Sequence, residues 1–302
     1  MSACRSTRRS HSQGWFSIVS APVFLRYSPP PPELGDRISS LYELRQDVEQ
    51  FNELDKADRP QLRIMLSGDG EYRFTTGRVD QAWDITLLGP TSGPIVCVGH
   101  GPMHVVGVGL LPPAWVSIMG TRADRCTDCA IDARELFGER ADTLRRSVAA
   151  APDTESRFRL LCEFALEVTR ITDPQQLSFT QMVDNWLASY VDPRIETLVE
   201  QSGLSMRQLE RMAKRYYGLP PKTLARKYRA LRAAAALARG EDLDEAGLSD
   251  SFYDQSHLIR EVKRFAGLTP RQLRGSEARM IGKVARGRKG LSGKVGPLVS
   301  DS

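Results

Sequence analysis

The pattern of apolar and polar residues predicts a β-rich first half. Between about residues 34 and 119, short apolar runs such as Leu62–Leu66 and Ile95–Val98 are separated by glycine turns at Gly68-Asp69-Gly70 and Gly89-Pro90. Alternation with a period of two, interrupted by glycine turns, is typical of half-buried strands. We therefore expect a small barrel or sandwich in this part of the chain.

Beyond Asp132 the apolar residues follow a helical spacing instead. The first such segment has an N-cap candidate at Thr154 and an apolar stripe made of Phe158, Leu161, Ala165 and Val168. After Asp173-Pro174 the helical spacing continues to about Arg274. The predicted fold class is α+β: a small N-terminal β-barrel with helices, followed by an all-α C-terminal domain.

Composition divides the chain further. Residues 1–33 are basic and then proline-rich, ending in Pro29–Pro32, and are predicted to form a flexible tail. We expect a β-rich domain over 34–173 and a helical domain over 174–275. Residues 276–302 are rich in Gly, Ser, Lys and Arg and are predicted to be a disordered basic tail.

Charge and cysteine content narrow the function classes only slightly. The net charge of +5 permits an anionic partner without requiring one. No apolar run approaches the ~20 residues that cross a bilayer, and five irregularly spaced cysteines fit a reducing cytosol, so we expect a cytoplasmic location. Cys126 and Cys129 have no second pair at zinc-finger spacing, and we interpret them as ordinary thiols.

The helical region contains an internal repeat. At an offset of 49 residues, the distance from Gly218 to Gly267, the same residue type recurs at several positions. The matching positions are Leu209 and Leu258, Arg211 and Arg260, Lys214 and Lys263, Arg215 and Arg264, Leu219 and Leu268, and Pro221 and Pro270. About one identity would be expected by chance in such a window. Two copies of one supersecondary unit explain the repeat.

Each copy has the sequence pattern of a helix-turn-helix unit, at about 192–218 and 243–267. In the first, Asp192-Pro193 starts a short helix, Ser202-Gly203-Leu204 makes a tight turn and Ser205 caps a second helix. In the second copy Asp254 is the cap. The second helix of each copy has a buried apolar stripe, which leaves basic residues on the opposite face.

Those basic residues suit DNA. Arginine can bind guanine with two hydrogen bonds, and lysine can pair with phosphate. The alternative, a merely solvated helix face, is weakened because the same face occurs twice. The segment from Pro220 to Leu237 joins the two copies as a predicted rod of about 25 Å. Such a rod can help hold two recognition helices one turn of DNA apart.

The stretch from Phe252 to Pro270 closely resembles the signature of the AraC/XylS transcription regulators, and the resemblance covers about Asp184 to Arg274. It implies sequence-specific DNA binding through two helix-turn-helix units and a linker helix. By position, it implies base contacts from Arg207, Glu210 and Arg211 in the first unit and Gln255, Ser256 and Arg260 in the second. Lys214 and Lys263 complete the predicted DNA-binding set, and no cofactor is expected.

The N-terminal part resembles, more loosely, the cupin-like domain of some family members, around Gly99–Pro102 and Val105–Pro112. This implies a ligand-sensing or dimerising module, so a small-molecule effector and a second copy of the chain are candidate partners. RNA polymerase is a further partner if the protein is an activator. Where the family has small and apolar residues, this chain has Gly247, Asp250 and Ser251. We therefore expect the second unit to be weakly held, with Asp250 facing the core.

Two other functions stay open at this point. An architectural or repair protein could use the same arginines on phosphate without reading sequence. A metal-dependent cupin enzyme could use His100 and His104 with Asp84 and Cys97, but no carboxylate partner is evident and no metal site is expected. Nucleophile-elbow, P-loop and dinucleotide motifs are missing from the sequence.

Overall fold

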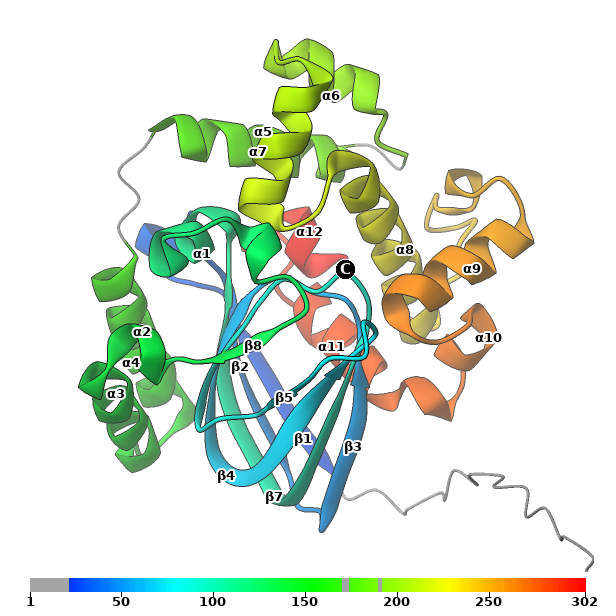
Figure 1. The fold of residues 1–302 in the computed structure, drawn as a ribbon. Coiled ribbons are helices and arrows are strands. Elements are labelled where there is room, and N and C mark those ends of the chain that lie inside the picture. The colour runs from blue at the N-terminus through cyan, green and yellow to red at the C-terminus, as the bar shows by residue number, and fades with distance from the viewer. Residues whose placement is uncertain (1–21, 170–173, 190–191) are drawn as a thin grey trace, which may run out of the picture.

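A strongly curved antiparallel sheet forms the first half of the protein (Figure 1). The computed structural model describes residues 22–169, 174–189 and 192–302. In that part of the chain the sheet has eight strands: β1 (Val23–Ser28), β2 (Ile38–Gln46), β3 (Gln50–Asp55), β4 (Gln61–Phe74), β5 (Val79–Gln81), β6 (Ile85–Leu88), β7 (Ile95–Leu110) and β8 (Ala130–Asp132).

The two longest strands give the sheet its barrel shape. β4 and β7 pair from Gln61 opposite Gly109 to Phe74 opposite Ile95, with register shifts on either side of Ser67. On its other edge, β7 pairs with β3 near its start and with β2 near its end. The strands therefore enclose an interior lined by apolar and aromatic side chains, among them Phe51, Met65, Tyr72, Met103 and Val105.

Helices cover the other face of this sheet. They are α1 (Pro112–Met119), α2 (Arg134–Phe137), α3 (Glu139–Ala150) and α4 (Thr154–Val168), with short 3-10 turns η1 (Pro32–Leu34) and η2 (Ala123–Arg125). Trp115, Phe158 and Leu161 pack there against Ile64 and Val106 of the sheet. The apolar stripe predicted for α4 is the face that is buried.

The second half is helical, as the spacing predicts. It contains α5 (Pro174–Ser189), α6 (Ile195–Ser202), α7 (Met206–Tyr217), α8 (Pro221–Arg239), η3 (Ser249–Ser251), α9 (Gln255–Ala266), α10 (Pro270–Leu273), η4 (Ser276–Ala278), α11 (Arg279–Lys289) and α12 (Pro297–Ser300). The predicted α+β class, a small β-barrel with helices before an all-α part, is confirmed. No helix in the described ranges has the length and apolar character that spanning a bilayer requires.

The prediction of a disordered C-terminal tail is wrong. Residues 276–302 form η4, α11 and α12, and α11 lies between the barrel and α8 (Figure 1). Met280 packs into the barrel core and Ile281 packs on the second helix-turn-helix unit. A glycine-rich composition is typical of disorder, but Gly282 and Gly287 allow α11 to approach its neighbours closely. In the fold a Cβ at 282 would lie 3.0 Å from the Ala238 carbonyl, and one at 287 would lie 2.5 Å from the Tyr27 ring.

The predicted N-terminal boundary also differs from the structure. β1 lies inside the segment expected to be a flexible tail, and it pairs with β2 from Val23 opposite Gln46 to Ser28 opposite Leu41. The strand is short and precedes four prolines, so its weak alternation is easily overlooked. The basic residues before it, up to residue 21, lie outside the described residues.

Candidate nucleic-acid interface

The first recognition-helix candidate is α7. Its N-cap Ser205 accepts a hydrogen bond from the Gln208 backbone N–H, which relieves one unpaired donor at the helix start. The helix ends at Gly218, whose φ of 78° is the left-handed conformation that glycine adopts most easily. Leu209, Ala213 and Tyr216 are buried, so the face opposite this stripe is turned outward.

The second candidate, α9, repeats this construction at the offset found in the sequence. Its twelve residues correspond one by one to those of α7. Asp254 caps its start by accepting from the His257 N–H at 2.6 Å, and Gly267 ends it with a φ of 81°. The internal repeat therefore describes two copies of one capped helix, as predicted.

All eight residues predicted to contact DNA have side chains that solvent reaches. Seven are exposed and Lys214 is half-buried: Arg207, Glu210, Arg211, Lys214, Gln255, Ser256, Arg260 and Lys263. The four on α7 line a shallow hollow together with Ser205 and Gln208. On α9, Ser256, Arg260 and Lys263 line a second hollow with Ile259 and Arg264. Across the described ranges, Arg207, Arg211, Arg260 and Lys263 make no ion pair. These cations are therefore available to an external anion.

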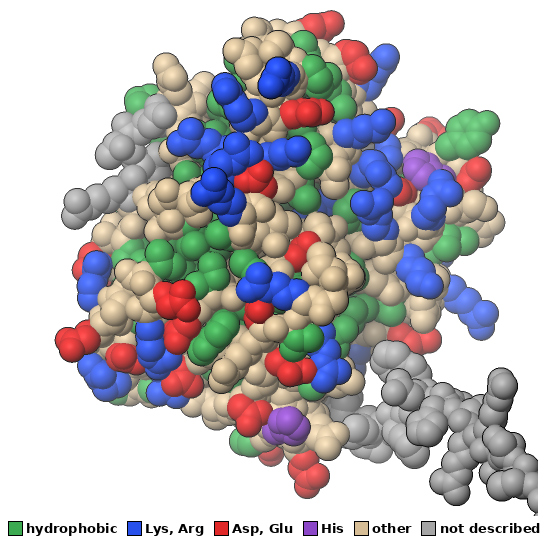
Figure 2. Space-filling view, viewed as in Figure 1, with side chains coloured by type: hydrophobic (Ala, Val, Ile, Leu, Met, Phe, Trp, Pro, Cys, Tyr) green, Lys and Arg blue, Asp and Glu red, His purple; other side chains and the backbone are tan. Residues whose placement is uncertain are grey.

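The two basic faces are on the same side of the molecule. Figure 2 shows lysine and arginine side chains gathered over α7 and again over α9, both turned toward the viewer. Phosphate groups flank the major groove of DNA on both sides, so a duplex laid across this face would meet positive charge at both helices.

The barrel contacts the C-terminal end of each recognition helix, which the sequence did not predict. A Cβ at Gly218 would lie 2.3 Å from the Thr127 hydroxyl, and a Cβ at Gly267 would lie 2.7 Å from a methyl group of Leu54. The Ala57 N–H also donates to the Phe265 carbonyl at 2.8 Å. The equivalent ends of the two repeats thus both rest on the N-terminal domain, which fixes their relative placement.

The linker helix α8 is not an exposed rod. Thirteen of its nineteen residues are buried, including Lys227 and Arg229. The Lys227 ammonium donates to the backbone carbonyls of Asp58 and Thr91, both at 2.7 Å, and burial lowers the pKa of Lys227 to about 7. The alanine run at residues 233–236 was the available sequence signal for burial, whereas the six basic residues of this helix pointed to an exposed surface.

Asp58 lies at the centre of a polar junction between the barrel, α8 and α11. Its carboxylate accepts from the Arg59 backbone N–H at 2.8 Å and from both terminal nitrogens of Arg288 on α11. Burial alone would raise the pKa of Asp58, but the charges of Arg288 and Lys56 outweigh burial and lower it. The Arg59 side chain meanwhile donates to the Tyr228 hydroxyl on α8 at 3.0 Å.

The second unit differs from its sequence prediction at its first helix. The helix expected around residues 243–250 is replaced by turns and by η3. Gly247 has a φ of 65°, in the left-handed region. A residue with a Cβ would pay about 1–2 kcal/mol to adopt this backbone conformation, so glycine is the suitable residue there. Asp250 is exposed and Ser251 is buried, so the expectation that Asp250 faces the core is wrong.

The recognition helix of this unit is nevertheless anchored. Glu261 of α9 is 1% exposed and accepts two hydrogen bonds from the Arg226 guanidinium of α8, at 2.8 and 2.6 Å. Val262 and Ala266 pack against Ala233, Leu237 and other apolar residues of the same cluster. Glu261 points away from solvent although its neighbours Arg260 and Lys263 point outward, a distinction that the spacing of charges did not reveal.

The four residues considered as metal ligands do not converge. His100 pairs with Asp69, His104 with Glu43, and Asp84 with Arg134, while the Cys97 thiol accepts from Arg63 at 3.8 Å. Among the residues that the structure describes, no group of three or more His, Cys, Asp or Glu side chains is placed to hold a metal ion.

Cys126 and Cys129 are both buried free thiols, and the Cys129 thiol donates to the Cys126 carbonyl at 3.2 Å. A hydrogen bond from Cys129 lowers the pKa of Cys126 to about 7. The pair lies immediately after η2, on the loop that contacts the end of α7.

Comparison with known proteins agrees with this geometry over the helical region. Residues 198–276 match a family model described as a helix-turn-helix domain. The F1 operon positive regulatory protein of Yersinia pestis is 40% identical over 103 residues, which is 31% of this chain and 34% of that protein. The match therefore spans about a third of the length of this curated relative.

Among solved structures, a variant of ToxT from Vibrio cholerae superposes with a TM-score of 0.46 and 11% identity, covering 83% of this chain and 96% of ToxT. The AraC-like transcriptional activator CuxR superposes with a TM-score of 0.32 and 13% identity, covering 74% and 90%.

Proposed function

We propose that this chain is a member of the AraC family of regulators, on the strength of its helix-turn-helix region and its match to a positive regulatory protein, and that the whole protein is a sequence-specific transcription regulator that reads two successive major grooves of DNA. The observation that carries the proposal is the pair of capped helices, repeated at a fixed offset, with exposed basic side chains on one face of the molecule. DNA is in the bacterial cytoplasm, and we place the protein there.

Each DNA-contacting residue has a proposed role. Arg207, Arg211 and Arg260 reach base edges, where the guanidinium fork fits guanine O6 and N7. Glu210 can accept a hydrogen bond from a base amino group, and Gln255 can both donate to and accept from a base. Ser256 can bind either a base or a phosphate. Lys214 and Lys263 lie one turn further along their helices and serve phosphates.

The decisive experiment is selection of bound sites from genomic DNA fragments, followed by affinity measurements on the selected site and on random DNA at one salt concentration. We expect a ratio of about 10³ or more, which is typical of specific binders. Equal affinities would instead support an architectural or repair protein that does not read sequence.

Arg211→Ala tests the proposed readout. We expect a loss of about 1–3 kcal/mol in binding the preferred site and relaxed choice at one base position, because a bidentate base contact is removed. Fluorescence anisotropy with a panel of single-base variants measures both effects. Arg146→Ala removes the same charge from the exposed surface of α3 and should change neither. A loss that is equal on every sequence would reassign Arg211 to a phosphate.

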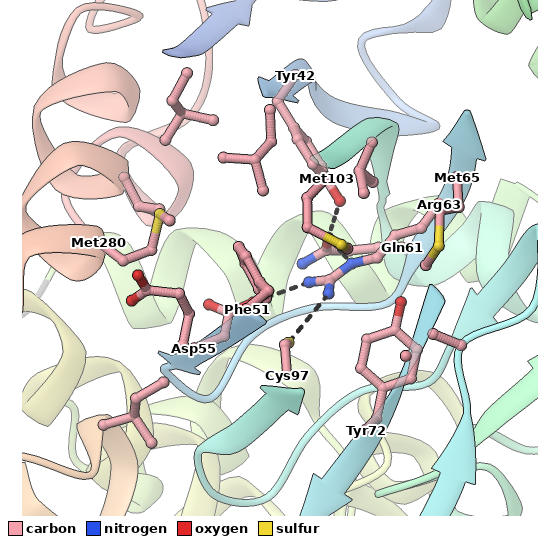
Figure 3. Close-up of a pocket in the computed structure, with 18 of the residues that line it drawn as sticks. Tyr42, Phe51, Asp55, Gln61, Arg63, Met65, Tyr72, Cys97, Met103 and Met280 are labelled. Carbon is pink, nitrogen blue, oxygen red and sulfur yellow. Dashed lines mark hydrogen bonds and ion pairs between the residues drawn. The ribbon is translucent and has the colours of Figure 1, made fainter. Parts of the chain in front are cut away.

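We also propose a small-molecule effector site inside the barrel. The interior holds a cavity of about 90 Å³ lined mainly by aromatic and aliphatic side chains, with Arg63 at its centre (Figure 3). The Arg63 guanidinium donates to Asp55 at 2.8 Å and to Gln61 at 3.0 Å, so its charge is already compensated. The remaining lining includes further charged side chains, among them Glu53, Glu71 and Arg288, but most of its surface is apolar, which favours a compact, mainly apolar organic molecule.

The cavity also points to a way of coupling effector to DNA binding. Met280, Val284 and Arg288 of α11 form part of its wall, and α11 packs on the linker helix α8. Sites for drug-sized ligands usually occupy about 300–1,000 Å³, so a ligand of that size requires a wall of the cavity to move, and α11 is the wall that also contacts α8.

Thermal-shift screening with small apolar compounds tests the effector site. Compounds that stabilise the wild type should not stabilise Met280→Trp, in which the larger side chain fills part of the cavity. Val79→Trp adds the same side chain at an exposed position on β5 and should leave the shift intact. Equal shifts in both variants would place the compounds elsewhere.

A further inference from the structure

A loop of the N-terminal domain lies beside the first recognition helix. The segment from Thr121 to Asp128, which contains η2, follows α1 and packs on the C-terminal half of α7. The Thr127 hydroxyl donates to the Gly218 carbonyl at 3.3 Å, and Val116 of α1 packs against the apolar core of the helical domain. The loop is therefore held in place at the end of α7.

The loop contributes to the same surface as the base-reading residues. Arg122 lines the hollow that also contains Arg207, Arg211 and Lys214 of α7. Its side chain is 39% exposed and forms a bidentate ion pair with Asp124, with hydrogen bonds of 3.0 and 2.7 Å. Asp124 in turn lies close enough to Lys214 for that lysine to help lower the pKa of Asp124.

The outward charge of the loop is positive. Arg122 and Arg125 together outnumber Asp124 at the surface, and Asp128 is buried, where it accepts from the Ser92 backbone N–H. Arg125 is exposed and forms no ion pair in the described part of the chain. Figure 2 shows the resulting continuity, with basic side chains running from α7 onto the adjoining surface near α1.

The position of the loop determines which part of DNA it would meet. A recognition helix places the residues of its first turns on base edges, whereas elements beside the helix face the sugar–phosphate backbone that walls the groove. The loop is beside the later turns of α7, and its cations are of the type that neutralises phosphates.

On the basis of the proposed function, we propose that Arg122 and Arg125 of the N-terminal domain bind backbone phosphates of the DNA that α7 reads. The DNA interface then extends beyond the helix-turn-helix region onto the β-barrel domain. Affinity gained in this way depends on salt and is independent of base sequence. A movement of the barrel relative to α7 would consequently change DNA affinity without any change in the recognition helices.

The test compares salt dependence in full-length variants. Arg125→Ala and Arg122→Gln should each reduce the magnitude of the slope of log affinity against log salt by about 0.9, and the double variant should reduce it by about 1.8, on the selected site and on random DNA alike. Arg146→Ala on α3 is the matched control and should keep the wild-type slope. Circular dichroism and thermal melting establish that each variant is folded.

The outcomes separate this inference from the proposed function. If both Arg122→Gln and Arg125→Ala keep the wild-type salt slope, the inference is overturned. Tighter DNA binding by either variant would also overturn it and would mean that the loop obstructs DNA. Failure of the wild type to prefer its selected site over random DNA would overturn sequence-specific regulation, whatever the slopes. Loss of affinity confined to one base position would also contradict phosphate contact.

Discussion

Truncation after Gly275 is expected to lower the free energy of unfolding by several kcal/mol. The removed segment buries Met280 and Ile281, and burying two large apolar side chains is worth about 3–6 kcal/mol before chain ordering is counted. Its loss also uncovers the barrel cavity and one side of α8 and removes Arg288 from Asp58. Urea denaturation followed by circular dichroism measures the change.

A variant that keeps the helix but loses its accessible charges is the control for this truncation. Lys283→Ala, Arg286→Ala and Lys289→Ala together should change stability far less. Lys283 and Arg286 donate to the Val23 and Ala238 carbonyls, and Lys289 pairs with Asp301 near the surface. A truncated protein as stable as the full chain would show that α11 does not close the barrel and would restore the disordered-tail interpretation.

Asp58→Ala is expected to cost about 3–5 kcal/mol of stability, because it leaves the Arg288 guanidinium buried without its counter-ion. Asp58 is 8% exposed, and its carboxylate also accepts from Gln61 at 3.2 Å, so no water replaces the lost contacts easily. Urea denaturation of the two proteins at pH 7 gives the difference. Glu167→Gln, which disrupts the exposed pair with Arg140, is the surface control and should cost at most about 1 kcal/mol.

The contribution of Asp58 has a definite pH dependence. Its pKa is lower in the folded protein than in the unfolded chain, where aspartate has a pKa of about 3.9. The stabilisation is therefore fully present above about pH 5 and is lost as the pH falls toward the lower folded pKa. We expect the stability difference between wild type and Asp58→Asn to shrink below pH 4. A difference that grows in acid would contradict the assigned ionisation.

The junction around Asp58 also explains why the helical region is not independent of the barrel. Lys227 of α8 donates to carbonyls of the barrel, Arg288 of α11 pairs with Asp58, and the ends of α7 and α9 rest on barrel residues. A fragment that begins near Thr180 would lose the barrel, and it would lose the first part of α5 as well, including Phe179, which packs in the core of the first unit. A fragment without the barrel should therefore be less stable than the full chain, and it should begin no later than Pro174 to keep the core of the first unit.

Several features followed from the sequence alone because they depend on local physics. The offset repeat located α7 and α9, since cap residue, apolar stripe and terminal glycine are encoded within a dozen neighbouring residues. The same period fixed which side chains point outward, so Arg211 and Arg260 could be assigned to the exposed face. Alternation and glycine turns likewise predicted the β-rich half.

Tertiary structure decided what local patterns cannot encode. Residues 276–302 look disordered by composition, yet their glycines allow α11 to approach Tyr27 and Ala238, which are distant in sequence. The charges of Lys227, Glu261 and Arg288 resemble surface charges until the fold supplies carbonyls or counter-ions for them. Arg122 joins the recognition surface only because the barrel packs on α7. Periodicity specifies which face of an element is buried, whereas the partner of that face depends on contacts between distant segments.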